Sequence, residues 1–296
     1  MRVLITGGTG FVGQALCPSL KAAGHEAVIL TRQSRPRLPQ GATSATRLAD
    51  LDAGSFDAVV NLAGAPVDGG RWTERRLKEL FDSRVVTTAA LVEWLRASRR
   101  RPQVLVSASA VGYYGEQGDR PITEDTRPTP GLTHDLCAAW EAEAQKAAAL
   151  GVRVCAMRIG VVLDRGGGAL AKMLPAFQFG VGGRLGDGRH YFPWIHREDT
   201  VAACRWLIEN PKARGAYNLS APNPVTNAEF TRELGRALGR PTVLPMPAAA
   251  LKLLFGDMAQ LLLASDRMLP QRLLDEGFRF RYATLESALA AIFGRP

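Results

Sequence analysis

Three glycines spaced three residues apart, Gly7, Gly10 and Gly13, stand within the first thirteen residues of the chain. This spacing lets the backbone turn sharply and approach a pyrophosphate, whose charge could then lie on the free N–H groups of a helix N-terminus. A glycine-rich turn can also be a plain loop, so its chemistry depends on the elements that flank it. The residues expected to contact the phosphates are Gly7, Thr9, Gly10, Phe11, Val12 and Gly13.

The residues on either side of this turn have the patterns of regular elements. Val3–Thr6 is a short apolar run rich in β-branched residues, which indicates a strand. An amphipathic pattern then runs from Phe11 to Gly24, as in a helix, and Glu26–Leu30 is a second strand. Strand, glycine turn, helix and strand form a βαβ unit, the context in which such a turn binds a dinucleotide. We therefore expect a dinucleotide site here.

The end of the second strand carries the residues that would select the cofactor, Thr31 and Arg32. At this place an acidic residue hydrogen-bonds the ribose 2′-hydroxyl of NAD, whereas an arginine accommodates the 2′-phosphate of NADP. No Asp or Glu occurs between Leu30 and Ala49, so Arg32 predicts NADP(H). The alternative is that Arg32 is an ordinary surface residue.

A further strand pattern, Ser55–Asn61, ends in Leu62, Ala63 and Gly64. Ligands of such sheets bind outside the carboxyl ends of the strands, where short side chains let the backbone lie against a flat ring. These three residues are therefore candidates for contact with the adenosine half of the cofactor.

A long helical pattern at 72–98 follows and contains Glu79 and Arg84. Arg84 could reach a cofactor phosphate with Glu79 nearby. The two could equally form an ordinary surface charge pair.

The rest of the chain continues the alternation of strands and helices and then loses it. Strand patterns recur at 103–107, 152–159 and 216–219, and helical ones at 136–150 and 227–238, the last with Asn227 as its N-cap. Between 166 and 194 glycines and aromatic residues could line a substrate pocket or belong to the core. We predict an α/β fold with a Rossmann-type, doubly wound parallel sheet formed by 1–160 and part of 190–220. Most of 161–296 would form a smaller C-terminal lobe.

Composition narrows the class of protein. Hydrophobic residues make up 46% of the 296 and charged residues 22%, as in ordinary globular chains. The net charge is +9, but the arginines are scattered, and the one dense run, Arg99–Arg101, has no interleaved aromatic residues. We therefore expect no nucleic-acid partner.

The cysteines and the apolar stretches point to a cytoplasmic protein. The four cysteines are far apart and have neither zinc-ligand nor disulfide-framework spacing, so we expect no metal site. The most apolar stretch, 248–264, is too short and too interrupted by charges to cross a membrane. A strand beginning at the third residue leaves no room for a signal peptide.

Several segments together resemble the extended short-chain dehydrogenase/reductases, the group of sugar-nucleotide epimerases and dehydratases. The segments that carry the resemblance are 6–13, Asn61–Gly64, Ser107–Ser109 with Tyr114–Gly115, Arg158–Gly160, Trp194–Asp199 and Ala216–Leu219. Leu269–Leu273 and Glu276–Phe280 look like the tail of an atypical, epimerase-like subgroup. The resemblance implies an NADP-binding Rossmann lobe and a smaller substrate lobe.

The catalytic residues depart from that family. Members that oxidise or reduce use Tyr-x-x-x-Lys on one face of a helix, where the ammonium lowers the pKa of the phenol toward working pH. In the corresponding helix this chain has Thr133 and Cys137, and none of its five tyrosines is followed four residues on by lysine. We therefore predict that the usual proton relay is absent.

Ser109 matches the family's serine and would hydrogen-bond a substrate oxygen. Tyr114 could act as a substitute acid, as could His134 or Cys137. The alternative for each is structural: packing for Tyr114, a surface position for His134 and the core for Cys137.

Two functions remain open. The first is an NADP-dependent oxidoreductase or epimerase-like enzyme with an unidentified small-molecule substrate. The second is a non-catalytic NADP(H)-binding sensor or regulator, which needs cofactor affinity but no proton relay. The sequence determines neither the substrate nor the oligomeric state, and a homodimer is one candidate assembly.

Overall fold

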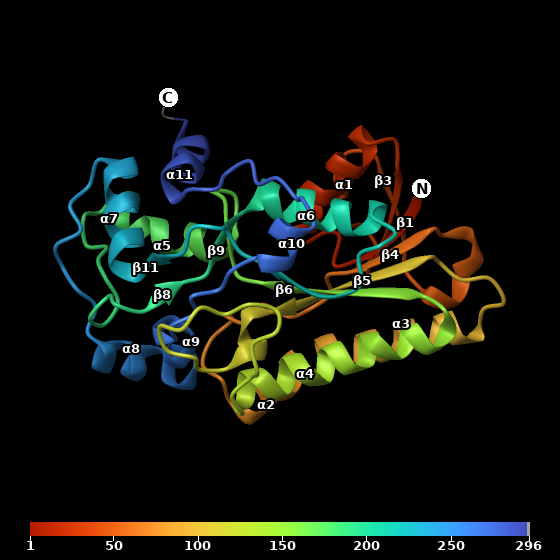
Figure 1. Ribbon diagram of the computed structural model, residues 1–296, viewed down its shortest axis with the longest axis horizontal. Coiled ribbons are helices and arrows are strands. Elements are labelled where there is room, and N and C mark those ends of the chain that lie inside the picture. Colours follow the sequence, from red (N-terminus) through yellow and green to blue (C-terminus); the bar gives the residue numbers. More distant parts are fainter. Residues whose placement is uncertain (295–296) are drawn as a thin grey trace.

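A seven-stranded parallel sheet forms the centre of the molecule (Figure 1). A computed structural model describes residues 1–294, with side chains other than those at 254, 255 and 257. The strand order is β10-β6-β5-β4-β1-β2-β3, the doubly wound, Rossmann-type order with one added edge strand. This confirms the predicted fold class. The strands are β1 (Arg2–Thr6), β2 (Glu26–Leu30), β3 (Ala42–Ala45), β4 (Ala58–Asn61), β5 (Val104–Ala110), β6 (Arg153–Ile159) and β10 (Gly215–Leu219).

Helices cover both faces of the sheet, which is why its strands are continuous apolar runs. Alternate residues of β1 face opposite cores: Val3 and Ile5 pack on one side and Leu4 on the other. α1 (Gly13–Ala22) and α6 (Arg197–Glu209) bury their apolar residues in the first core. The second core receives α3 (Thr87–Ala97) and the end of α4 (Leu132–Gln145). Figure 1 shows these helix pairs on opposite sides of the sheet.

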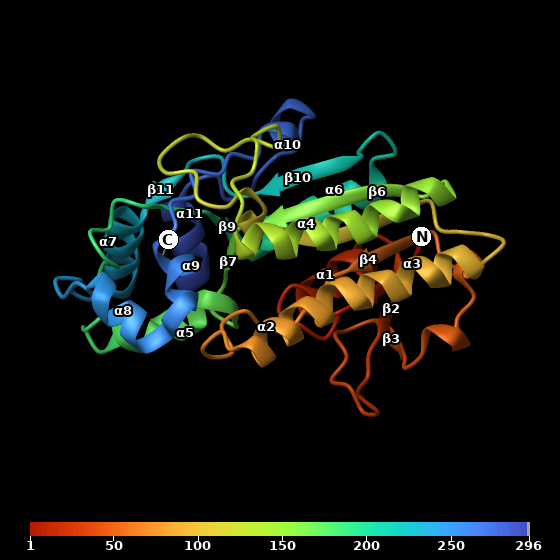
Figure 2. The ribbon, with the colours of Figure 1, turned by 90° about the horizontal axis from the view of Figure 1, so that it is seen from below.

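A separate apolar cluster lies at the end of the molecule drawn on the left in Figure 2. Leu170, Leu174 and Phe177 of α5 meet Phe230 and Leu234 of α7 there, beside the last helix. The elements of this part are β7 (Val161–Leu163), α5 (Gly168–Gln178), β8 (Tyr191–Phe192), β9 (Trp194–His196), β11 (Val225–Thr226), α7 (Asn227–Leu238), α8 (Ala248–Phe255), α9 (Ala259–Leu263) and α11 (Leu285–Phe293). A further helix, α10 (Gln271–Asp275), lies against β10.

Three details differ from the sequence-based expectations. The helix predicted at 72–98 is α2 (Glu74–Phe81) and α3, joined by a π-helical turn at Asp82–Val86. β3 was not predicted, because it is a half-exposed edge strand without apolar alternation. The N-cap of α7 is Thr226, which forms a capping box with Glu229, and not Asn227. The Asn227 side chain instead accepts a hydrogen bond from the Leu185 N–H.

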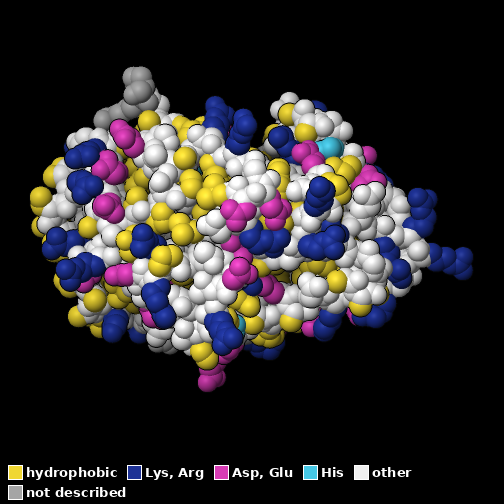
Figure 3. All heavy atoms as spheres, in the orientation of Figure 1, with side chains coloured by type: hydrophobic (Ala, Val, Ile, Leu, Met, Phe, Trp, Pro, Cys, Tyr) yellow, Lys and Arg dark blue, Asp and Glu magenta, His cyan; other side chains and the backbone are white. Residues whose placement is uncertain are grey.

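The surface has a mixed charge. On the face drawn in Figure 3, Lys and Arg side chains are spread out, with Asp and Glu between them. All four cysteines are buried and free. Within residues 1–294, no helix has the length and apolarity needed to cross a bilayer.

Candidate functional site

The glycine turn forms a cradle at the carboxyl end of β1. Gly7 has a φ of +69°, and a Cβ there would lie 2.5 Å from the Leu62 carbonyl oxygen. A Cβ on Gly13 would lie 2.5 Å from the Gly8 backbone, and the Gly10 N–H closes the turn on the Gly7 oxygen at 2.9 Å. A side chain at either position would therefore collide with backbone.

The N-terminus of α1 begins at this cradle and has no side-chain cap. No side chain hydrogen-bonds its first N–H groups from the cap position, Val12, and no acidic residue stands in its first turn. The Gln14 N–H donates to the Gly10 carbonyl at 2.9 Å, so what the helix offers an anion such as a phosphate is mainly the positive end of its dipole. Phe11 packs on the backbone at Gly167 and Gly168, and the Arg197 guanidinium lies 4.7 Å from its ring centroid.

The end of β2 lies beside the cradle, since Thr6 pairs with Leu30. Thr31 is buried and its hydroxyl accepts the Gln33 N–H at 3.2 Å. Arg32 is exposed, and its side chain has no partner among residues 1–294. The Gln14 amide donates to the Arg37 carbonyl at 3.1 Å and so holds the following loop against α1.

A buried hydrogen-bond network at the end of β4 positions Leu62 and Ala63. Asn61 is fully buried; it accepts from the Thr6 hydroxyl at 2.6 Å and donates to the Thr88 hydroxyl at 2.8 Å. The Ala63 N–H donates to the same Thr6 hydroxyl at 3.3 Å. No pattern near Asn61 predicts this role, because its partners come from distant segments.

Arg84 lies at the same edge of the sheet, in the π-helical turn. It donates to the carbonyls of Leu80 at 3.1 Å and Ala65 at 3.0 Å, and its guanidinium lies 5.3 Å from the Trp140 ring centroid. A Cβ on Gly64 would lie 3.1 Å from its Cζ atom. Burial lowers the pKa of Arg84, and no carboxylate of the described chain pairs with it. The site therefore holds a desolvated cation with donors to spare.

Glu79 lies apart from Arg84. It is exposed on α2 and forms an ion pair with Arg76, with 2.6 Å between Oε2 and Nη1. The structure therefore brings Arg84 to Gly64 but does not pair Glu79 with Arg84.

A second polar network joins the carboxyl ends of β5 and β6. The Ser109 hydroxyl donates to Glu141 Oε1 at 2.6 Å. The Arg158 guanidinium donates to both oxygens of Glu141, each at 2.9 Å. Two parallel bonds between a guanidinium and a carboxylate fix both groups strongly. Ser109 is therefore bonded to a carboxylate whose position Arg158 fixes.

Tyr114 continues this network to the edge strand. It is fully buried, donates to Asn218 Oδ1 at 2.6 Å and accepts from Arg158 Nη1 at 2.9 Å. Burial raises the pKa of Tyr114 to about 12, although Arg158 opposes the shift. Because the Tyr114 hydroxyl already donates its proton to Asn218, Tyr114 is better placed to position its neighbours than to donate a proton to a substrate.

The other two candidate acids, Cys137 and His134, also contact neighbouring residues of the protein. Cys137 is buried, and burial raises the pKa of its thiol to about 12. Thr133 and Cys137 both lie against Gly112, whose added Cβ would be 3.0 Å from Thr133 Cβ and 3.7 Å from the Cys137 sulfur. His134 contacts the Tyr113 carbonyl at 2.6 Å through Nδ1.

The sheet order and the uncapped helix at its carboxyl edge define the Rossmann class of α/β proteins, whose nucleotide ligands bind at this edge. The chain belongs to the NAD-dependent epimerase/dehydratase family, whose model matches residues 3–220. Residues 246–292 match a domain of unknown function, DUF1731. These matches confirm the family resemblance seen in the sequence.

Relatives match the chain along its whole length. It is 40% identical to the chloroplastic homolog of epimerase family protein SDR39U1 of Arabidopsis thaliana, with 99% of this chain and 86% of that protein covered. Identity to epimerase family protein YfhF of Bacillus subtilis is 36%, with 99% and 98% covered. The crystal structure of human epimerase family protein SDR39U1 (isoform 2) with NADPH has a TM-score of 0.92 at 36% identity, covering 100% of both chains.

Proposed function

We propose that this chain binds NADP(H) and works as an oxidoreductase or epimerase-like enzyme on a small molecule in the cytoplasm. The observation that carries the proposal is the cradle: Gly7 and Gly13 leave no room for a Cβ, and the adjoining helix N-terminus has no side-chain cap. The human relative of similar fold was solved with NADPH.

We assign a part of the cofactor to each segment at the carboxyl edge of the sheet. The turn from Gly7 to Gly13 holds the pyrophosphate, Thr31 and Arg32 the 2′-phosphate, and Leu62 to Gly64 the adenosine half. Arg84, a cation without a carboxylate partner in the described chain, reaches a phosphate oxygen, and Glu79 is assigned no contact with the cofactor because it pairs with Arg76. The bound cofactor would supply or accept a hydride.

We assign cofactor binding to residues 1–160 with part of 190–220, and substrate binding mainly to the remainder. Ser109 can accept a hydrogen bond from a substrate hydroxyl while it donates to Glu141. Tyr114 would hold Asn218 and Arg158 in place, because its buried proton is already shared with Asn218.

Substitution of Arg32 tests the cofactor choice. A charge-assisted hydrogen bond contributes about 1.5–3 kcal/mol, or roughly 10- to 150-fold in affinity. Arg32→Asp should therefore weaken NADPH binding by this factor and leave NADH binding nearly unchanged, whereas Arg35→Asp on the same loop should affect NADPH much less. Equal losses for NADPH and NADH would refute the role of Arg32.

A non-catalytic NADP(H) sensor is the second candidate. It is favoured by the burial of Tyr114 and by Thr133 and Cys137 at the positions of the usual acid and its ammonium. Turnover of NADPH with a panel of carbonyl compounds separates the two functions. Tight NADPH binding without turnover by any compound would favour the sensor, and turnover that depends on Ser109 would favour the enzyme.

A further inference from the structure

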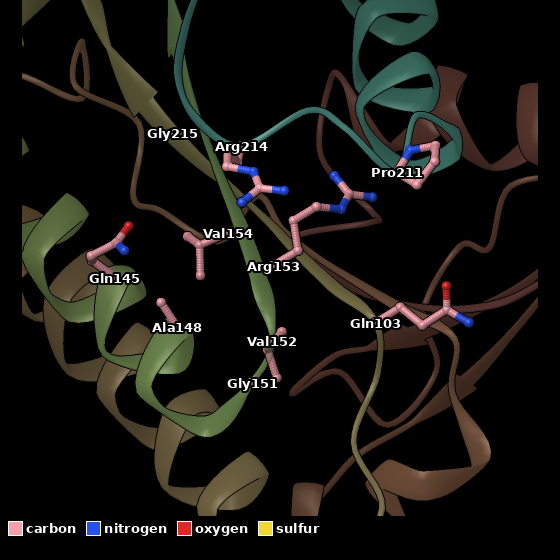
Figure 4. A pocket seen from close by; sticks show the side chains of 10 residues that line it. All are labelled: Gln103, Gln145, Ala148, Gly151, Val152, Arg153, Val154, Pro211, Arg214 and Gly215. Atoms are coloured by element: carbon pink, nitrogen blue, oxygen red, sulfur yellow. The ribbon is translucent and has the colours of Figure 1, made fainter.

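A groove of about 680 Å³ opens at the amino ends of β5, β6 and β10 (Figure 4). Its walls come from the start of β6, the end of α4 and the connection between α6 and β10. Because the strands are parallel, this is the edge opposite the glycine cradle. The volume falls in the range of small-molecule sites. The groove is therefore separate from the proposed cofactor site.

One wall of the groove contains Arg153, whose guanidinium is held in place by backbone carbonyls. Arg153 Nη1 donates to the carbonyls of Leu207 at 2.9 Å and Ala213 at 2.7 Å, and its Nη2 donates to that of Ile208 at 3.0 Å. These bonds hold the guanidinium at the carboxyl end of α6, where the helix dipole favours a positive charge. Its Nε donor is not used by these bonds.

A second cation lines the same groove. Figure 4 shows Arg214 beside Arg153, whose own side chain extends toward Pro211 at the end of α6. Arg214 is exposed, and its side chain has no hydrogen-bond or ion-pair partner among residues 1–294. Arg101 donates to the Leu150 carbonyl at 3.5 Å, which places a third cation next to the groove residue Gly151.

The lining contains no opposite charge. Its ten residues, all within the described part of the chain, include two arginines and two glutamines but no Asp or Glu. Two like charges in one groove repel each other, and a bound anion would offset that repulsion by attracting both of them. Guanidinium groups prefer phosphate and carboxylate oxygens, which they bind with paired hydrogen bonds.

We propose that this groove binds a small polyvalent anion of the phosphate or polycarboxylate type. Arg153 supplies the fixed charge and Arg214 closes on the ligand, while the amides of Gln103 and Gln145 offer neutral hydrogen bonds. The size of the groove and its position between secondary-structure ends suit a metabolite-sized ligand rather than a nucleic-acid strand.

Calorimetric titration with inorganic pyrophosphate at low ionic strength tests the proposal. Pyrophosphate could also bind at the 2′-phosphate position of the proposed cofactor site, so wild type is compared with Arg214→Gln and Arg32→Gln. We expect Arg214→Gln to weaken one binding event by roughly tenfold or more and Arg32→Gln to leave that event unchanged. Both arginines are exposed, so neither variant should lose its fold. Unchanged binding by Arg214→Gln, or no binding by wild type, would overturn the proposal.

Arginine modification locates the ligand. Phenylglyoxal labelling followed by mass spectrometry should show that pyrophosphate protects Arg214 and leaves the exposed Arg240 reactive. Protection confined to Arg32 would mean that the anion binds only at the proposed cofactor site, and protection of Arg214 and Arg240 alike would mean non-specific binding. Either result would overturn the proposal. Since no NADP(H) is used, failure here is distinguishable from failure of the proposed function.

Discussion

The phenolic oxygen of Tyr114 lies 2.6 Å from Asn218 Oδ1, and this bond ties the turn after β5 to the edge strand β10. Asn218 in turn donates to the Leu269 carbonyl at 2.9 Å, so the same chain of bonds reaches the C-terminal tail. Tyr114, which the sequence suggests as a substitute acid, thus helps to join the turn after β5, strand β10 and the C-terminal tail.

Removal of this hydroxyl should cost stability but not cofactor affinity. Tyr114→Phe leaves Asn218 Oδ1 and one Arg158 donor without a partner in a buried place, which costs about 1–3 kcal/mol of unfolding free energy. Urea denaturation measures this loss. Tyr282→Phe, whose hydroxyl makes an exposed contact, is the control and should cost much less. A loss of NADPH binding free energy that exceeds the loss of unfolding free energy in Tyr114→Phe would contradict the positioning role.

The glycine cradle can be tested with a matched pair of glycines. Gly7 and Gly24 have φ values of +69° and +77°, but only at Gly7 would a Cβ meet other atoms. Gly24→Ala should cost about 1–2 kcal/mol for the left-handed conformation alone. Gly7→Ala should cost more and should also weaken NADPH binding, as thermal unfolding and fluorescence titration would show. Equal effects of the two substitutions would mean that the close approach to Leu62 is unimportant.

Asp266 should make stability depend on pH near neutrality. Burial, with a smaller contribution from Glu116, raises the pKa of Asp266 from 3.8 to about 7. The folded state therefore keeps a proton that the unfolded state releases, so stability from this group is lost as pH rises from about 4 to 7. Asp266→Asn resembles the protonated form and should raise the melting temperature above pH 7 but hardly at pH 4.

Melting temperatures across this pH range, with exposed Asp50→Asn as the control, check this expectation. A gain from Asp266→Asn that is the same at acidic and at alkaline pH would show that Asp266 does not hold its proton in the folded state.

The C-terminal tail protects the open edge of the sheet. Arg272 Nη1 donates to the carbonyls of Arg214 at 2.9 Å and Ala216 at 2.8 Å, on the free side of β10. Arg272→Met should lower the unfolding free energy by about 1–2 kcal/mol and expose an edge that favours aggregation. Denaturation and light scattering measure the two effects. Arg279→Met, at an exposed position of the same tail, should change neither.

Local patterns predicted the sheet well and the polar networks poorly. The runs at β1, β2, β4, β5 and β6 are apolar because both faces of each strand are buried, and that property is visible in the sequence. β3 has no such pattern, since it is a half-exposed edge strand.

The polar partners depend on contacts across long separations in the chain. Ser109 meets Glu141 32 positions away, and Tyr114 meets Asn218 104 positions away. The hydrophobic periodicity of a single helix or strand cannot predict which residues of another element it will contact. The helical pattern at 72–98 predicts that Glu79 and Arg84 lie near one another. In the structure a π-helical turn lies between α2 and α3, and Glu79 pairs with Arg76 instead.

Titration of the wild-type protein with NADPH and NADH, at one salt concentration, tests the central claim most directly. We predict saturable binding of NADPH, tighter than that of NADH by roughly 10- to 150-fold, because in our proposal the 2′-phosphate lies at Arg32 and no acidic residue is expected there. A protein that binds neither nucleotide, or that prefers NADH, would contradict the account.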